Sequence, residues 1–237
     1  MRRDKLREPA NEFFIRWGVF VVGLLVMSFG ISLMIRAEAG SAPWDVFHIG
    51  LYNQFGLTIG TWSIIAGIAI LAITAVLQHE LPKAGAFLNM LLVGVFIDMY
   101  LFLPILHTPG HTFGKGLMLI AGILIMGYGI GLYIAADRGA GPRDSLMLVL
   151  TEKTGWKVQH IRLSMEIIVL FLGWMLKGPI FIGTLIFCLS IGAIVGFSLP
   201  QCRNLVDRLV ERGGQSENIY KRKIRANDYD GLSKKAR

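Results

Sequence analysis

Six long runs of apolar residues constrain this chain more than any other feature of its sequence. The apolar core of a bilayer is about 30 Å thick, and a helix crosses it with roughly 20 apolar residues. Backbone polar groups find no water there, so each run must satisfy its own hydrogen bonds as an α-helix. The sequence therefore predicts an all-α integral membrane protein in contact with the lipid bilayer. Its six transmembrane helices lie near 14–36, 58–78, 84–104, 114–136, 159–177 and 180–200.

The charged residues gather toward the two ends of the chain. Only 17% of the 237 residues are charged, although the net charge is +8. Soluble domains carry about 25% charged residues. In a membrane protein, a positive balance is typical of cytoplasmic ends that face anionic lipid. We therefore expect no nucleic-acid partner.

The distribution of Lys and Arg predicts the orientation of the chain. The N-terminal arm and the link at 137–158 are basic, whereas 37–57 and 105–113 contain no Lys or Arg. The segment from residue 201 carries ten Lys or Arg against five Asp or Glu. The positive-inside rule then places both termini and the 137–158 link in the cytoplasm.

The sequence divides into a membrane domain and a tail. Residues 1–200 form the predicted membrane domain, and residues 201–237 form a basic cytoplasmic tail. The stretch 201–212 has the pattern of an amphipathic helix at the membrane surface. The polar residues after it predict disorder, because they offer little apolar surface to bury.

One unusual pattern occurs twice. "FGISLMIRAEAGSAPWD" at 29–45 and "YGIGLYIAADRGAGPRD" at 128–144 are identical at eight of seventeen positions at an offset of 99. Hydrophobic bias explains matched Ile and Leu, but not two Gly pairs, a Pro pair and an Asp pair in register. We interpret the chain as a duplicated unit of three spans, about 14–104 and about 114–200.

An odd number of spans in each unit makes the second unit enter the membrane from the opposite side. The two units are then inverted-topology repeats, an arrangement typical of transporters with a binding site at the repeat interface. The charges agree, because the link after the first span lacks Lys and Arg in unit one and is basic in unit two.

Each duplicated motif predicts a short helix after the first span of its unit. Pro43 and Pro142 suit a first helical position, and Asp45 and Asp144 then face the positive end of the helix dipole. The helices, near 43–54 and 142–153, are too short to span. They are either re-entrant half-helices that point at a shared cavity or interfacial helices with well-made starts. The sequence leaves both open.

Further polar residues near the membrane are candidates for the same site. Asp98 lies deep in the third span, and intramembrane carboxylates usually face a bundle interior. Arg36 ends the first span and could pair with Glu38, Asp45 or Asp98. Asn89 faces away from Asp98 on its predicted helix. The candidate substrate-binding residues are Arg36, Pro43, Asp45, Asn89, Asp98, Pro142, Arg143 and Asp144.

The sequence contains no motif that predicts catalysis, a cofactor or a metal. Neither a zinc motif, nor a phosphate-binding loop, nor a nucleophile elbow occurs. His107 and His111 flank "TPG", whose Pro and Gly break the helix that would align the two rings. Cys188 and Cys202 have no metal-ligand spacing. We expect no catalytic residues, no cofactor and no resident metal.

The stretch "GSAPWDVFHIGLYNQFGLTIGTWSIIAGIAIL" and the later "GAFLNMLLVGVFIDMYL" resemble the YczE-like bacterial membrane proteins, a group that includes YyaS and YitT. The match covers about 14–200, although the second motif reads "GPRD" where the first reads "PWD". The resemblance implies a multi-pass protein of the bacterial inner membrane with an unidentified substrate. Some members are linked to secondary-metabolite production, through export or a helper role.

Two functions fit these features. The first is a secondary transporter or facilitator of a small solute, with its site between the repeats. The second is a non-transport accessory protein that scaffolds a membrane-associated complex. A transporter requires a polar cavity at the repeat interface, whereas a scaffold requires its cytoplasmic tail. The substrate, the coupling ion, the direction of transport and assembly as a homo-oligomer are left open.

Overall fold

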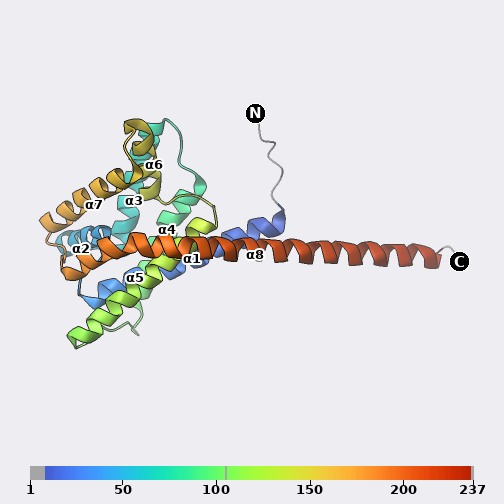
Figure 1. The fold of residues 1–237 in the computed structure, drawn as a ribbon, viewed down its shortest axis with the longest axis horizontal. Helices are drawn as coiled ribbons and strands as arrows, with labels where there is room; N and C mark the ends of the chain where they lie inside the picture. Colours follow the sequence, from blue (N-terminus) through green and yellow to red (C-terminus); the bar gives the residue numbers. More distant parts are fainter. Residues whose placement is uncertain (1–8, 105, 236–237) are drawn as a thin grey trace.

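The computed structural model describes the backbone of residues 9–104 and 106–235, and side chains as far as Gly213. Within these residues the fold is all-helical (Figure 1). The helices are α1 (Ala10–Ala37), α2 (Pro43–Phe55), α3 (Ile59–Gln78), α4 (Ala84–Phe102), α5 (Thr112–Ala135), α6 (Pro142–Thr154), α7 (Val158–Met175) and α8 (Ile182–Lys235).

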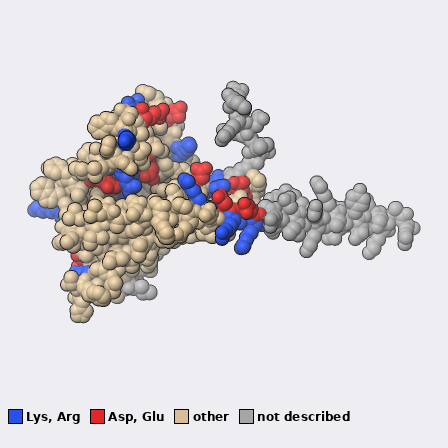
Figure 2. Space-filling view, in the orientation of Figure 1, with Lys and Arg blue, Asp and Glu red and all other residues tan. Residues whose placement is uncertain are grey.

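Six of these helices are long and apolar enough to cross a membrane, which confirms the number of predicted spans. They are α1, α3, α4, α5, α7 and the part of α8 up to Gly213. Large apolar side chains lie exposed on their outer faces, for example Val76, which is 71% exposed, and Leu189, which is 85% exposed. In water such surface would be costly, so these faces are suited to lipid. Figure 2 shows the same uncharged surface over most of the bundle.

The centre of the bundle is the contact between α1 and α5. A Cβ atom on Gly30 would lie 2.4 Å from the backbone nitrogen of Met126, and one on Gly129 would lie 2.3 Å from that of Met27. Small residues let membrane helices approach until their backbones nearly touch. The buried core around this contact includes Leu24 and further side chains of α4 and α8.

The duplicated motifs form two short helices, α2 and α6, of 13 residues each. Pro43 and Pro142 occupy their first turns, and each helix follows a glycine at positive φ. The φ angle is +124° at Gly40 and +141° at Gly139, a conformation that side chains rarely adopt. At 1.5 Å per residue each helix is roughly 20 Å long, less than the bilayer core. Both short helices are therefore confirmed, and each ends one residue later than predicted.

Each short helix packs against a helix of the other half of the chain. The short helix α2 packs against α7, and α6 packs against α3. At the loop before α2, the backbone N–H of Gly183 donates to the Ala39 carbonyl over 3.0 Å. At the loop before α6, a Cβ on Gly85 would lie 1.9 Å from the Arg138 carbonyl oxygen. Each of these two loops thus contacts the start of a helix from the other half of the chain.

The last helix differs from expectation. Residues 201–235 continue α8 in the structure, where the sequence predicts a short amphipathic segment and then disorder. Lys, Arg and Glu have good helix propensity, and no proline follows Pro200 to end the helix. Figure 1 shows α8 extending well beyond the bundle, and Figure 2 shows charged side chains gathered where it leaves.

Candidate functional site

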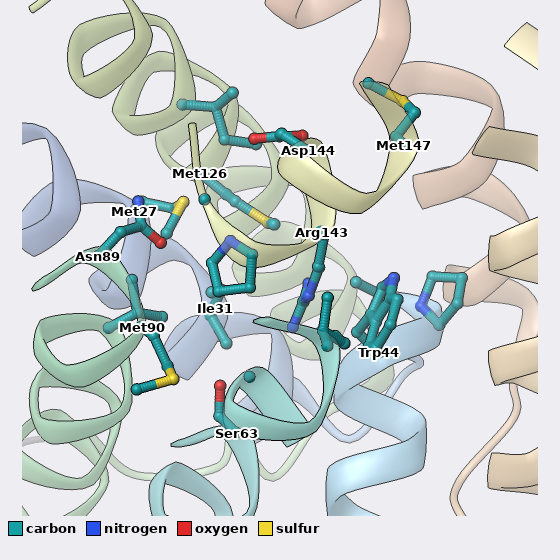
Figure 3. Close-up of a pocket in the computed structure, with 18 of the residues that line it drawn as sticks. Met27, Ile31, Trp44, Ser63, Asn89, Met90, Met126, Arg143, Asp144 and Met147 are labelled. Atoms are coloured by element: carbon teal, nitrogen blue, oxygen red, sulfur yellow. The ribbon is translucent and has the colours of Figure 1, made fainter. Parts of the chain in front are cut away.

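A cavity of about 190 Å³ lies inside the bundle, where the starts of α2 and α6 meet. Its wall contains residues from all eight helices, including Ile191 from α8. Figure 3 labels Ile31 from α1 and Ser63 from α3 among them. The side chains that bring polar atoms to this wall are Trp44, His48, Ser63, Asn89, Tyr133, Arg143, Asp144, Arg162 and Glu166.

Both proline-led helix starts lie on the cavity. Pro43 and Pro142 line it, and the first-turn N–H groups of a helix have no partner within the helix. These groups and the helix dipole place a partial positive charge at each start. Two positive helix ends therefore face the same cavity.

Arg143 is the central charged group of the site. Its guanidinium carbon lies 4.5 Å from the centre of the Trp44 ring, so the side chain bridges α6 and α2. Figure 3 shows it reaching from the start of α6 toward Trp44. Among the described residues it makes no hydrogen bond and no ion pair within 4.0 Å. Its donors are thus available to a ligand.

The other charged groups on the wall have partners. The Tyr133 hydroxyl donates to Oδ2 of Asp144 over 2.6 Å. Nε of Arg162 donates to Oε1 of Glu166 over 3.1 Å. Asp144 and Glu166 are therefore each occupied by a local donor.

Asp45 occupies the position of α2 that matches Asp144 in α6, but its surroundings differ. The side chain is 1% exposed, and its Oδ2 atom has no hydrogen-bond partner among the described residues. Burial raises the pKa of Asp45 from its ordinary 3.8 to about 6, although Arg143 and the Ala42 backbone lower it. Asp45 lies beside the cavity wall rather than on it. It is a buried carboxyl group that keeps its proton to a higher pH than an ordinary Asp.

His48 and Asn89 face the cavity with unpaired nitrogen atoms. His48 is 1% exposed, and neither ring nitrogen has a partner among the described residues. Burial lowers the pKa of His48 well below its ordinary value, so the ring is neutral. Asn89 is 5% exposed and lies against Gly141, the residue before Pro142. Its Nδ2 atom is also without a described partner.

Two of the predicted site residues lie elsewhere. Arg36 does not line the cavity, and its guanidinium donates to the Leu101 carbonyl rather than to Asp45 or Asp98. Asp98 accepts from Oγ1 of Thr58 and, over 2.8 Å, from the backbone N–H of Gly60. Both residues hold helix ends in place, and Asp98 does so at the start of α3.

The structure adds residues that the sequence interpretation did not select. His48 lies three residues after Asp45 on one helix, a spacing that could have identified it. Trp44 stands inside the duplicated motif, opposite Arg143 in the alignment of the two copies. Tyr133 aligns with Met34, so the duplication carries no signal for it. In the part of the chain that the structure describes, no three His, Cys, Asp or Glu side chains form a metal-binding group.

Comparisons with known proteins place this chain among bacterial relatives. A family described as "Family of unknown function (DUF6198)" matches residues 14–200. The "Uncharacterized membrane protein YczE" of Bacillus subtilis (strain 168) is 47% identical over 204 residues, which cover 85% of this chain and 94% of that protein. An "Uncharacterized protein" of Haemophilus influenzae is 31% identical over 81% of this chain and 84% of its own length. The "Uncharacterized protein YyaS" of Bacillus subtilis is 28% identical, over 86% of this chain and 98% of that protein. No solved structure matches.

Proposed function

We infer that this chain, which belongs to the family of unknown function DUF6198, carries a small solute across the bacterial inner membrane. Its relatives confirm the resemblance to YczE-like proteins, and a relative named as a membrane protein agrees with the six apolar helices. The cavity and the helices around it support the transport activity. The proposed carrier is a secondary transporter or facilitator rather than an enzyme.

The proposal includes two inverted repeats, α1–α4 and α5–α8. Four of the five non-glycine residues at positive φ in the described chain form two pairs, Glu38 with Asp137 and His79 with Lys177, at offsets of 99 and 98, and Leu57 has no counterpart. The end of α2 lies beside the end of α7, where Nε2 of Gln54 donates to the Leu176 carbonyl over 3.4 Å. The end of α6 lies beside the end of α3 instead. Three spans per unit put these two ends on opposite faces of the membrane.

The orientation of the repeats follows from charge. The proposed topology places both termini and the α6–α7 link in the cytoplasm, because Lys and Arg concentrate there. The short helix α2 then runs from the cavity toward the outer face, and α6 runs from it toward the inner face. In this arrangement α2 and α6 are re-entrant half-helices.

The observation that carries the proposal is the cavity at the meeting point of the two helix starts. It contains an imidazole and an amide whose nitrogen atoms have no hydrogen-bond partner among the described residues, and beside them lies the Arg143 guanidinium over the Trp44 ring. Buried polar groups are normally paired, so unpaired groups around a cavity predict a ligand. Rocking of one repeat against the other would expose the cavity to each side in turn.

A metabolite comparison tests the proposal. Cells that lack the protein are compared with cells that express it, and with cells that express the double variant Asp45→Asn, Asp144→Asn. We expect the distribution of one class of small solute between the inside and the outside of the cell to depend on the protein. The double variant should insert normally but fail to restore that distribution. Normal activity of the double variant would contradict a site at these helices.

The same cells separate the carrier from the scaffold. A chain without residues 213–237 is expected to insert and to restore the metabolite change, since every residue that lines the cavity precedes the deletion. Loss of complementation with normal insertion would favour the scaffold, because a scaffold depends on its cytoplasmic tail.

A further inference from the structure

We propose that the cavity binds the carboxylate of a small organic anion through Arg143 and Asn89, an assignment that rests on the proposed carrier function. The solute would lie with its carboxylate between the starts of α2 and α6 and with its apolar body against methionine side chains.

The unpaired groups on the cavity are mainly hydrogen-bond donors. Arg143 offers a planar fork of N–H groups that matches a carboxylate, and stacking on Trp44 holds that plane in position. Asn89 is 5% exposed, lines the cavity, and has an Nδ2 group without a described partner. The two helix starts add positive dipole ends. A ligand that satisfies this wall must bring acceptor atoms.

The acidic side chains on the wall interact electrostatically with Arg143, but none of them makes an ion pair with it within 4.0 Å among the described residues. Asp144 accepts from Tyr133, and Glu166 is paired with Arg162. Asp45 interacts with Arg143 through space, but no ion pair within 4.0 Å joins the two among the described residues. The cavity thus holds one cation whose positive charge is not matched by a bonded carboxylate.

The rest of the wall predicts the size and character of the solute. Methionine is flexible and polarizable, and it fits irregular apolar ligands. A cavity of about 150 Å³ binds benzene in another protein, so 190 Å³ is suited to one ring or a similar apolar body with a carboxylate. The methionines on the wall are Met27, Met90, Met126, Met147 and Met165.

Calorimetric titration of the purified full-length protein tests the assignment with three probes of one shape. Benzoate is the anion, benzamide the neutral analogue and benzylamine the cation. We expect benzoate to bind at least tenfold more tightly than either analogue, because charge-assisted hydrogen bonds are worth more than neutral ones. Arg143→Gln should weaken benzoate binding at least tenfold.

Control variants separate a lost ligand contact from a lost fold. Arg208→Gln removes the same atoms and charge from an exposed position of α8 and should leave benzoate affinity unchanged. If Arg143→Gln does not fold, Asn89→Asp provides the second variant. It keeps the shape of the side chain but places a negative charge beside the start of α6, and it should also weaken benzoate at least tenfold.

The outcomes distinguish this inference from the carrier function. Equal or tighter binding of benzamide or benzylamine would overturn the anion assignment and leave a carrier of another solute class. Unchanged benzoate affinity in Arg143→Gln or Asn89→Asp would also overturn it. If none of the probes bound, the assigned class and size would be wrong, while the metabolite comparison would still decide whether the protein is a carrier.

Discussion

Replacing Asp45 with Asn is expected to stabilise the folded protein at neutral pH while it abolishes transport. The carboxyl group is 1% exposed, and its Oδ2 atom has no described partner. Burial raises its pKa from 3.8 to about 6. Each pKa unit corresponds to 1.36 kcal/mol, so the charged form of Asp45 costs about 3 kcal/mol in the folded protein at a pH above both values.

The sign of the pH dependence follows from the raised pKa. Between about pH 4 and pH 6 the folded protein holds a proton that the unfolded chain releases, so stability falls as pH rises through this window. Asn removes this dependence and can still accept a hydrogen bond from the Ala42 backbone. It loses a favourable interaction of the charge with the α2 dipole, about 0.3–1 kcal/mol. The net gain is about 2 kcal/mol at pH 7.5, and it vanishes at pH 4.

Thermal unfolding in detergent at pH 7.5 and pH 4 measures the gain in stability and its pH dependence, and the metabolite comparison measures the loss of transport. For a chain of this size, 2 kcal/mol corresponds to a rise in Tm of about 4–8 °C. Asp207→Asn, at an exposed position of α8, is the control and should change Tm at neither pH. A lower Tm for Asp45→Asn at pH 7.5, or an equal difference at both pH values, would refute the argument that Asp45 is a buried, uncompensated carboxylate.

Three further predictions concern the frame around the site. Asp98→Asn should lower stability by about 1–3 kcal/mol, because Asp98 accepts hydrogen bonds at the start of α3, and it should leave benzoate affinity unchanged. A loss of affinity without a loss of stability would mean that Asp98 belongs to the binding site. Gly30→Ala should lower stability by about 1–3 kcal/mol or more, since the added Cβ would overlap the α5 backbone. Gly18→Ala should be tolerated, and equal stability of the two variants would disprove close packing between α1 and α5. Reporter fusions at Gly110 and Lys153 should read opposite sides of the membrane, and a common side would contradict the inverted repeats.

The sequence by itself determined the helices of this protein. Six apolar runs can only be helices in lipid, and Gly40 with Pro43 and Gly139 with Pro142 define where α2 and α6 begin. These signals are local, because they depend on the burial of one segment or on the conformational range of one residue. These signals therefore predict the helices without knowledge of any neighbouring helix. In α8 two local signals point in different directions, because the polar residues after 212 predict disorder while their Lys, Arg and Glu have good helix propensity.

Only the tertiary structure decided which polar side chains share the site. Asp98 lies within α4 and Asp45 at the start of α2, yet Asp98 accepts a hydrogen bond from the start of α3 while Oδ2 of Asp45 has no described partner. Trp44 and Arg143 stack although 99 positions separate them in the chain. Asn89 faces the cavity because Gly141, from the other half, leaves room for its amide. The role of each polar group depends on which donor or acceptor the opposite half brings within hydrogen-bond distance, and that is set by how α2 and α6 pack across the two halves.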